Sequence, residues 1–157
     1  MAGQLSPADV IELTRLTARY AHAIDRDQPE LLRDVFTEDA IIEFHLLGDA
    51  PTIRFEGLSS FLDRPGEPCR EQHLLSNHEF EADGDGATGS CYLQARQWRA
   101  EDPADRYVVG GRYEDRYRRL ATGWRIAERR CYFMWAEGNP AVLFGEPTDL
   151  TARSTGS

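Results

Sequence analysis

The chain has 157 residues, a formal net charge of −9 at pH 7 and 41% hydrophobic residues, which is the profile of one soluble globular domain. The acidic balance argues against nucleic acid and against a membrane surface as partners, because phosphate binding needs a concentrated basic surface. All 18 basic residues are arginine, so a Schiff-base mechanism, which needs a lysine amine, is excluded.

The first expected element is a helix that begins at Pro7 and ends at about Asp25. Ser6 is a good N-cap, Pro7 suits the first helical position, and Asp9 places negative charge near the positive end of the helix dipole. A second, shorter helix is expected over PELLRDVF, residues 29–36, before the polar segment TED. Together the two helices predict an αα-hairpin.

The rest of the chain favours strands. AIIEFHLL (40–47) and TIRFEG (52–57) are short strand candidates, and GLSSFLDR (57–64) is a small helix. Longer strand segments follow. HLLSNHEFEAD and TGSCYLQARQWRA are joined by a DGDG turn, and YVVGGRYEDRYRRL and WRIAERRCYFMWAE come after them. We expect an antiparallel meander, one domain over residues 1–147, and a flexible tail over 148–157.

Helices first and strands afterwards indicate an α+β fold. We expect a cone-shaped α+β barrel, in which a curved antiparallel sheet wraps around the N-terminal helices and encloses an internal apolar pocket. Gly110 and Gly111 lie in the middle of a strand, where they predict a bulge or a sharp bend.

Asp25 is the first candidate for chemistry. On a helical wheel it lies on the flank of the apolar arc, away from the strip that carries Arg15, Arg19 and His22. Asp25 is either a solvated helix-end residue, or the cap of the second helix, or an inward carboxylate. An inward carboxylate needs a hydrogen-bonding partner, because an isolated buried charge is too costly.

Histidine is the obvious partner, and the chain has four. His22 and His45 are expected to be surface or packing residues. His73 and His78 are five residues apart, so they face opposite sides of an undistorted strand, and only one of them is expected in the cavity. Local pattern does not say which.

Arg129 lies in the last strand, where simple alternation places it on one face with Arg125, Ala127, Cys131 and Phe133. An arginine beside apolar residues predicts either a pocket cation or a salt-bridged arginine of the sheet. The spacing of Cys69, Cys91 and Cys131 fits no metal site, so neither metal nor other cofactor is expected. The odd number of cysteines and the absence of an apolar leader favour a cytoplasmic protein.

Four segments carry a resemblance to a known family: RYAHAIDRD, LLRDVFTEDAIIEF, HLLSNHEFEADGDGA and GWRIAERRCYF. Across residues 8–136 the chain resembles the SnoaL-like branch of the nuclear transport factor 2-like superfamily. It is most similar to the group with scytalone dehydratase, bile-acid 7α-dehydratase and γ-hexachlorocyclohexane dehydrochlorinase. In that group an Asp at the end of the first helix and a His at the start of the third strand form a dyad, which the resemblance places on Asp25 and His73.

The resemblance also implies roles for two further residues. Arg129 matches a pocket arginine of the dehydrochlorinase, whereas Tyr20 matches a tyrosine of the dehydratases at a position where the dehydrochlorinase has lysine. The implied protein is a cofactor-independent lyase, a dehydratase that removes water from a steroid, polyketide or terpenoid-like ring. His73 acts as the general base, Asp25 orients it, Tyr20 assists the leaving group and Arg129 offsets developing charge. The expected pocket walls are Leu16, Phe44, Phe61, Tyr92, Trp98, Phe133 and Trp135.

Three alternatives stay open, since one fold hosts many functions. One is a polyketide cyclase or ketosteroid-isomerase-like enzyme with the same base. Another is an epoxide hydrolase with an Asp-Arg-Asp set, whose second Asp cannot be assigned. The last is a non-catalytic subunit, such as the β subunit of a ring-hydroxylating dioxygenase; a separation of more than about 6 Å between the Asp25 and His73 side chains would favour it. The related enzymes imply a homo-oligomer, with a trimer favoured and a dimer possible.

Overall fold

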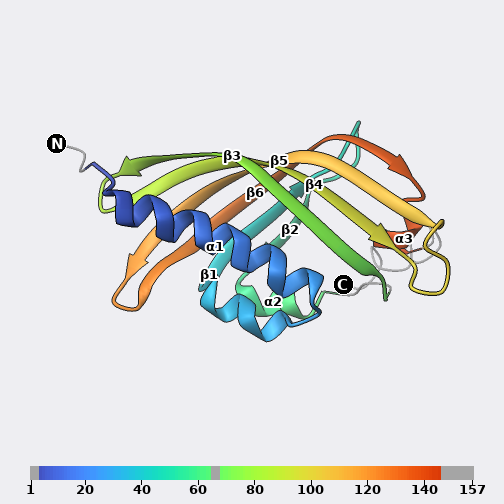
Figure 1. Cartoon of the computed structure of the whole chain (residues 1–157), viewed down its shortest axis with the longest axis horizontal. Helices are drawn as coiled ribbons and strands as arrows, with labels where there is room; N and C mark the ends of the chain where they lie inside the picture. The colour runs from blue at the N-terminus through green and yellow to red at the C-terminus, as the bar shows by residue number, and fades with distance from the viewer. Residues whose placement is uncertain (1–3, 65–67, 146–157) are drawn as a thin grey trace.

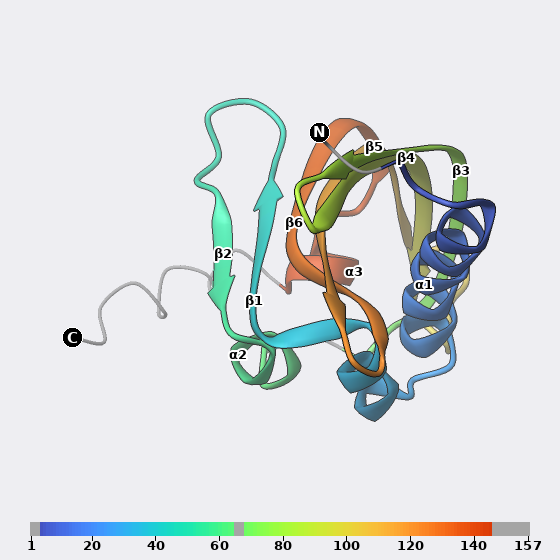
Figure 2. The ribbon, with the colours of Figure 1, turned by 90° about the vertical axis from the view of Figure 1, so that its left-hand side faces the viewer.

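The computed structural model describes residues 4–64 and 68–145. One long helix, α1 (Pro7–Asp25), packs along one side of a curved six-stranded sheet (Figure 1). Seen from the end, α1 lies on one side of the curled sheet and the hairpin of β1 and β2 on the other (Figure 2). The expected α+β fold, with helix packed on a curved sheet, is confirmed.

Helix α1 begins and ends where the sequence predicts. Ser6 caps it in a capping box: the Asp9 backbone N–H donates to the Ser6 hydroxyl, and the Ser6 backbone N–H donates to the Asp9 carboxylate. After Asp25 the chain turns through Asp27, which adopts the left-handed region at φ 54°. Asp25 is therefore the last helical residue.

The segment after α1 differs from the prediction. Residues Pro29–Asp34 form a short 3-10 helix, η1, and strand β1 (Phe36–His45) begins at Phe36, inside the stretch predicted to be helical. The reason is tertiary, because Phe36 is buried and pairs with Ile126, whose backbone N–H donates to the Val35 carbonyl. Helical periodicity reports only on neighbouring residues, so it could not reveal a strand partner ninety residues away in the sequence.

The sheet order is β2-β1-β6-β5-β4-β3. The predicted antiparallel meander is present, and its strands are β3 (Arg70–Asp83), β4 (Gly86–Trp98), β5 (Arg106–Leu120) and β6 (Gly123–Gly138). The sheet is not wholly antiparallel, because β1 pairs with β6 in parallel. The chain leaves β1 through β2 (Ile53–Glu56) and helix α2 (Leu58–Leu62) before it enters β3 at the far edge.

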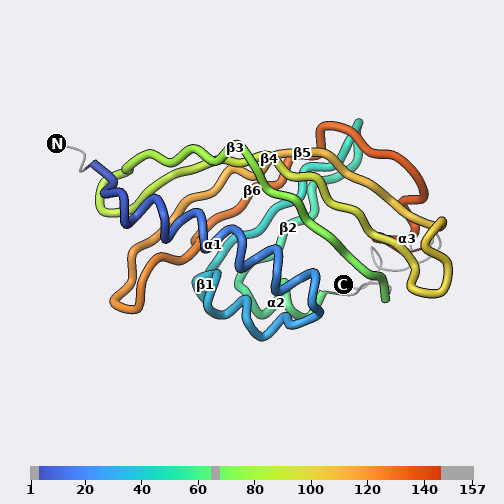
Figure 3. The backbone as a smooth tube through the Cα atoms, in the orientation of Figure 1, coloured from blue at the N-terminus to red at the C-terminus, as the bar shows by residue number. Residues whose placement is uncertain are grey.

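The predicted bend at Gly110 and Gly111 is confirmed. The register between β5 and β6 shifts there, where Gly110 lies opposite Trp135 and Gly111 opposite Phe133. A side chain at residue 110 has no room, since an added Cβ would lie 2.0 Å from the Trp135 ring. The curved course of these strands can be followed in Figure 3.

The core lies between α1 and the inner face of the sheet, the face that α1 covers. Its most buried members come from both layers: Leu13, Leu16, Tyr20, Phe36, Phe61, Tyr113, Trp124 and Ile126. A last short helix, α3 (Ala141–Phe144), was expected only as ordered chain. The predicted tail at 148–157 lies outside the described residues. Among the described helices, none has the length and apolar character needed to span a membrane.

Candidate active site

Asp25 and His73 lie in contact at the end of α1. The Asp25 Oδ1 is 2.7 Å from the His73 Nδ1, and the Asp25 Oδ2 accepts the His73 backbone N–H at 2.9 Å. The Asp25 side chain is 19% exposed and the His73 side chain 6% exposed. Both carboxylate oxygens are thus held by one residue of β3, and neither the solvated nor the helix-capping alternative describes Asp25.

This pairing fixes the tautomer of His73. An ionised carboxylate only accepts hydrogen bonds, so Nδ1 carries the ring hydrogen and Nε2 carries a lone pair. Nε2 has no hydrogen-bond partner among the described residues. It is also absent from the fully buried side-chain atoms that lack a partner in this part of the chain, so Nε2 is not fully buried. The nitrogen that could remove a proton is therefore the free one.

His78 lies on the same inner face as His73, and the expectation that the two face opposite sides is wrong. The cause is a β-bulge between Ser76 and Glu79, where Asn77 adopts a left-handed φ of 56° and two residues of β3 oppose one residue of β4. The bulge reverses the alternation, so His73 and Leu75 before it share a face with His78 and Phe80 after it.

His78 contacts α1 two turns before Asp25. Its Nε2 is 2.9 Å from the Thr17 Oγ1, whose own hydrogen goes to the Thr14 carbonyl at 2.8 Å. Nε2 must therefore donate, which leaves the lone pair on Nδ1, the opposite tautomer to that of His73. Burial, aided by the positive charge of Arg129 and opposed by Asp115, lowers the pKa of His78 below the ordinary 6.5.

Arg129 is a fully buried cation bound by a carboxylate that sequence reasoning missed. Its Nε donates to the Asp115 Oδ1 at 2.8 Å and its Nη2 to Oδ2 at 2.7 Å, and the Tyr117 hydroxyl donates to the same Oδ2 at 3.0 Å. Arg129 is 0% exposed and Asp115 3% exposed. A signal existed, because Asp115 stands between two inward tyrosines, Tyr113 and Tyr117, in an alternating strand.

The guanidinium of Arg129 is held between aromatic rings. It lies 4.4 Å from the ring centroid of Tyr20 and 3.9 Å from that of Tyr113. Burial opposes its charge, but the Asp115 carboxylate outweighs burial and raises the pKa of Arg129 well above its usual value. Its remaining nitrogen, Nη1, is buried without a hydrogen-bond partner among the described residues.

Tyr20 links the two groups. Its ring and the His73 ring form a T-shaped pair with centroids 6.0 Å apart, and its face receives the Arg129 guanidinium. Burial raises the pKa of Tyr20 above 10.0, although Arg129 and Arg64 act in the opposite direction. Tyr20 therefore keeps its hydroxyl hydrogen at neutral pH.

The face predicted for β6 is partly wrong. Arg129 and Cys131 are buried together, but they share the inner side with Trp124 and Ile126 and not with Arg125. Ala127 is an extra residue, because Arg116 pairs with Glu128 and the next residue of β5 pairs with Ile126. The resulting bulge shifts the alternation by one position.

The expected pocket walls divide between the two faces of the sheet. Leu16 and Phe61 are buried, and Phe44 and Phe133 pack against the core. Three others face away from α1, which corrects the prediction: Tyr92, Trp98 and Trp135. Tyr92 and Trp98 alternate with the buried inner residues of β4, and Trp135 is 40% exposed over Gly110.

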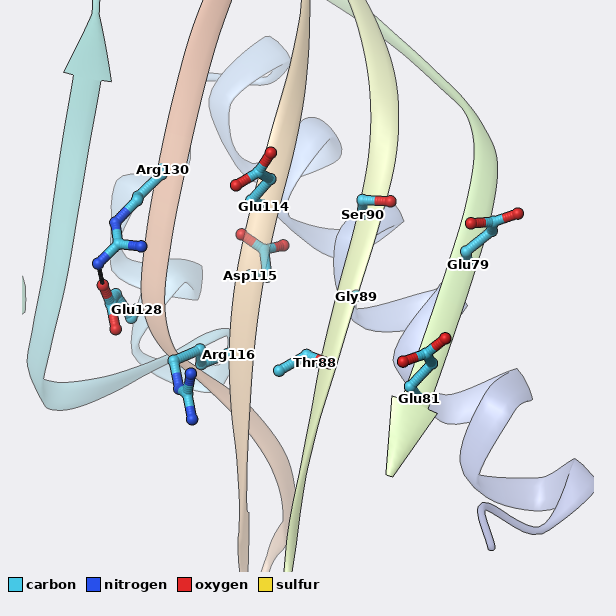
Figure 4. A pocket seen from close by; sticks show the side chains of 10 residues that line it. All are labelled: Glu79, Glu81, Thr88, Gly89, Ser90, Glu114, Asp115, Arg116, Glu128 and Arg130. Atoms are coloured by element: carbon cyan, nitrogen blue, oxygen red, sulfur yellow. Dashed lines mark ion pairs between the residues drawn. The ribbon is translucent and has the colours of Figure 1, made fainter. Parts of the chain in front are cut away.

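A hollow of about 400 Å³ lies on the outer face of the sheet, and of the residues in this cluster only Asp115 is among those that line it. Figure 4 shows its charged lining on β3 to β6 with α1 behind the strands. A second hollow is lined by residues of α1, η1 and the β5–β6 turn. Neither is lined by Asp25, His73 or Arg129.

The structure also bears on the metal site, on the other two histidines and on the Asp-Arg-Asp set. In the described ranges no three His, Cys, Asp or Glu side chains gather as a metal-binding group. His22 is exposed, and His45 stacks on Tyr132 and bonds Glu43, as a packing residue does. Arg129 binds Asp115, but Asp25 binds His73 instead, so the described residues do not form an Asp-Arg-Asp set.

A family model described as a SnoaL-like domain matches residues 7–130. The chain belongs to the SnoaL-like family. An uncharacterized protein of Mycobacterium tuberculosis is 30% identical over 123 residues, which are 78% of this chain and 83% of that protein.

Solved structures share the fold of this chain. A proposed aromatic ring hydroxylase from Novosphingobium aromaticivorans has a TM-score of 0.73 at 26% identity, with 87% of this chain and 97% of that chain covered. A proposed scytalone dehydratase from the same species has a TM-score of 0.68 at 18% identity, with 84% and 88% covered. This SnoaL-like chain thus has the nuclear transport factor 2-like fold, which is shared with proteins named as dehydratases, hydroxylases and dioxygenase β subunits.

Proposed function

We propose that this SnoaL-like protein is a cofactor-independent dehydratase that uses the Asp25–His73 dyad as its general base. The observation that carries the proposal is the 2.7 Å contact between the Asp25 Oδ1 and the His73 Nδ1, with the other ring nitrogen unpartnered among the described residues. The proposed substrate is a hydroxylated ring with a carbonyl group, which makes the C–H bond next to that carbonyl acidic.

The first step is transfer of the C–H proton to the His73 Nε2. The ring then becomes an imidazolium, and the Asp25 carboxylate stabilises the new charge through the hydrogen bond to Nδ1. Because the His73 backbone N–H also holds Asp25, the ring is oriented before substrate binds. A general base of this kind contributes about 10² to 10⁴ in rate.

The second step is departure of hydroxide from the neighbouring carbon as water. The electron pair left by the proton forms the new double bond, and the leaving oxygen takes a proton from the Tyr20 hydroxyl or from the His73 imidazolium. The free Nη1 of Arg129 is suited to donate a hydrogen bond to the carbonyl oxygen as negative charge develops there. Tyr20 contacts both His73 and Arg129, which supports this division of roles.

The runner-up is a polyketide cyclase or ketosteroid-isomerase-like reaction. It uses the same proton transfer but returns the proton to carbon, and nothing leaves. A non-catalytic subunit is disfavoured, because that role is expected to leave the Asp25 and His73 side chains more than about 6 Å apart. In the structure they are hydrogen-bonded to each other.

Two probes test the proposal. The first is exchange of the α-protons of 1-tetralone in D2O, followed by NMR, which measures proton removal alone. The second is conversion of 3-hydroxy-1-tetralone, a cyclic β-hydroxy ketone, to 1-naphthol, which also needs loss of water. We expect His73→Ala and Asp25→Asn to lower both rates, His73→Ala by about 10² to 10⁴.

Matched controls are available on the same helix and just beyond it. His22→Ala removes an exposed histidine, and Asp27→Asn removes an exposed carboxylate two residues after Asp25. Both are expected to keep the wild-type rates. Full turnover in both His73→Ala and Asp25→Asn would falsify the dyad, and exchange without formation of naphthol would favour the isomerase or cyclase.

A further inference from the structure

In the ion pair between Arg129 and Asp115, two nitrogens of the guanidinium donate to the carboxylate and the third has no hydrogen-bond partner among the described residues. Asp115 occupies Nε and Nη2 of the guanidinium, and with the Tyr117 hydroxyl its two oxygens accept three hydrogen bonds. A carboxyl group that accepts on both oxygens from a guanidinium is ionised. The buried pair is therefore electrically neutral as a unit.

The third nitrogen of this guanidinium is Nη1. It is a buried donor without a partner in the described residues, and the guanidinium that carries it lies on the ring of Tyr20, which also meets His73. Buried donors are almost always satisfied, so Nη1 is the place where an oxygen from outside the chain is expected.

The charged groups around this position do not add up to a positive site. Asp25 and Asp115 are two carboxylates, against the buried Arg129 and the partly exposed Arg64, whose guanidinium lies 4.1 Å from the Phe61 ring centroid. A carboxylate ligand would bring a net negative charge into a buried place, where charges interact strongly and water does not screen them. A neutral oxygen acceptor brings no such cost.

We propose that Asp115 determines the charge of the substrate. By neutralising Arg129, it makes the site accept an uncharged carbonyl or hydroxyl oxygen at Nη1 and reject a carboxylate. The inference rests on the proposed function only in placing the substrate beside His73. It makes Asp115 a specificity-determining residue and makes the substrate class a neutral oxygenated ring.

Three naphthalenes of similar shape test the inference: 2-acetylnaphthalene, 2-naphthoate and 2-ethylnaphthalene. Binding is measured by NMR titration of protein with 15N-labelled arginine side chains. We expect the wild-type protein to bind the ketone about tenfold or more tightly than either other probe, with a shift of the Arg129 resonances. If the ketone does not bind more tightly than naphthoate, the inference is overturned.

Asp115→Asn leaves Arg129 with an unbalanced positive charge. We expect this variant to bind 2-naphthoate about tenfold or more tightly than the wild type does. Asp85→Asn, in the exposed β3–β4 turn, removes the same formal charge outside the core. It is expected to bind 2-naphthoate as the wild type does. Unchanged naphthoate binding by a folded Asp115→Asn variant contradicts the inference.

The single variant can fail to fold, because an unpaired buried charge is costly. The double variant Asp115→Leu with Arg129→Met removes both charges and keeps an apolar core. It is expected to bind the ketone no better than 2-ethylnaphthalene, and a retained preference for the ketone would show that Arg129 is not the donor.

These measurements need no turnover, so the two proposals fail separately. His73→Ala is expected to keep the preference for the ketone while it loses proton exchange. If the wild type binds the ketone selectively but catalyses nothing, the proposed dehydratase function fails and the inference about Asp115 stands. If it catalyses the reaction without preferring the ketone, the inference about Asp115 fails and the proposed function stands.

Discussion

Asp25 is a carboxylate at the C-terminal end of a helix, where the helix dipole disfavours negative charge. The structure shows what compensates: two N–H groups of His73, one from the backbone and one from the ring. One hydrogen bond stabilises the carboxylate and the same carboxylate orients the imidazole. Structural and proposed catalytic roles thus share one contact.

His78 leads to a prediction about acid stability. Because its pKa is lowered in the folded protein, the unfolded chain binds a proton at a higher pH, so the free energy of unfolding falls as pH drops below 6.5 towards the lowered pKa. The neutral ring also keeps its bond to Thr17. We expect urea unfolding of His78→Gln to lose less stability than the wild type between about pH 7.5 and pH 5.5.

A direct check is NMR titration of the His78 ring. Its midpoint should lie below 6.5, with the hydrogen on Nε2 of the neutral form. His22→Gln, on the exposed side of α1, is the control and should keep the wild-type pH dependence of stability. An equal loss in His78→Gln and wild type would contradict the prediction.

At the scale of single elements, β3 depends on its bulge. Without the extra residue, His78 and Phe80 would point away from α1, and Thr17 would lose its partner. Asn77 makes the bulge possible, since it tolerates a left-handed backbone that branched side chains do not.

We therefore expect Asn77→Val to destabilise the protein by about 1–2 kcal/mol, whereas Asn77→Gly changes stability little. Ser76→Val is the matched control, because Ser76 is also exposed and precedes the bulge. Urea unfolding of the three variants makes the comparison. Equal stability of Asn77→Val and Ser76→Val would show that the bulge does not require a left-handed residue.

At the scale of the whole molecule, α1 is fastened to the sheet at both ends. Asp25 binds β3, and at the other end Asp9 accepts from the Arg119 guanidinium at 2.6 Å and from the Trp124 indole N–H at 3.1 Å. Glu12 accepts the Trp124 backbone N–H at 2.9 Å. The two fastenings join the helix to opposite edges of the meander.

Asp9→Ala is expected to cost about 1–2 kcal/mol of stability, because it removes the Asp9 half of the capping box and the hydrogen bonds that Asp9 accepts from the Arg119 guanidinium and the Trp124 indole. The hydrogen bonds from Ser6, with those from Arg119 and Trp124, lower the pKa of Asp9 below 3.8, so this contribution is present at neutral pH and is lost as the solution is acidified.

Urea unfolding measures the cost of Asp9→Ala, and Asp85→Ala in an exposed turn is the control. Tetralone exchange is expected to stay at the wild-type rate, because Asp9 lies about 24 Å along the helix from Asp25. A loss of exchange in a stably folded Asp9→Ala variant would show that the N-terminal fastening also positions the dyad.

The sequence predicted most of the local structure. The capping signals of SPAD placed the start of α1 correctly, its predicted end at about Asp25 also holds, and the DGDG turn and the Gly110–Gly111 bend were where turn chemistry puts them. Hydrophobic periodicity gave the wrong secondary structure where a strand is set by pairing with a segment distant in the sequence, as at Phe36. It failed again at the two bulges, near Asn77 and at Ala127, because one inserted residue reverses every later side chain.

By itself, the sequence determined the fold class and the start and end of α1, and its resemblance to the SnoaL-like family supplied the candidate residues Asp25, His73, Tyr20 and Arg129. Only the tertiary structure decided how these residues are arranged. It placed His78 on the inner face, turned Tyr92, Trp98 and Trp135 away from it, and paired Arg129 with Asp115. The physical reason is that helix caps and turns are specified by neighbours in the chain, whereas strand register and ion pairing are set by packing between segments that are distant in the sequence.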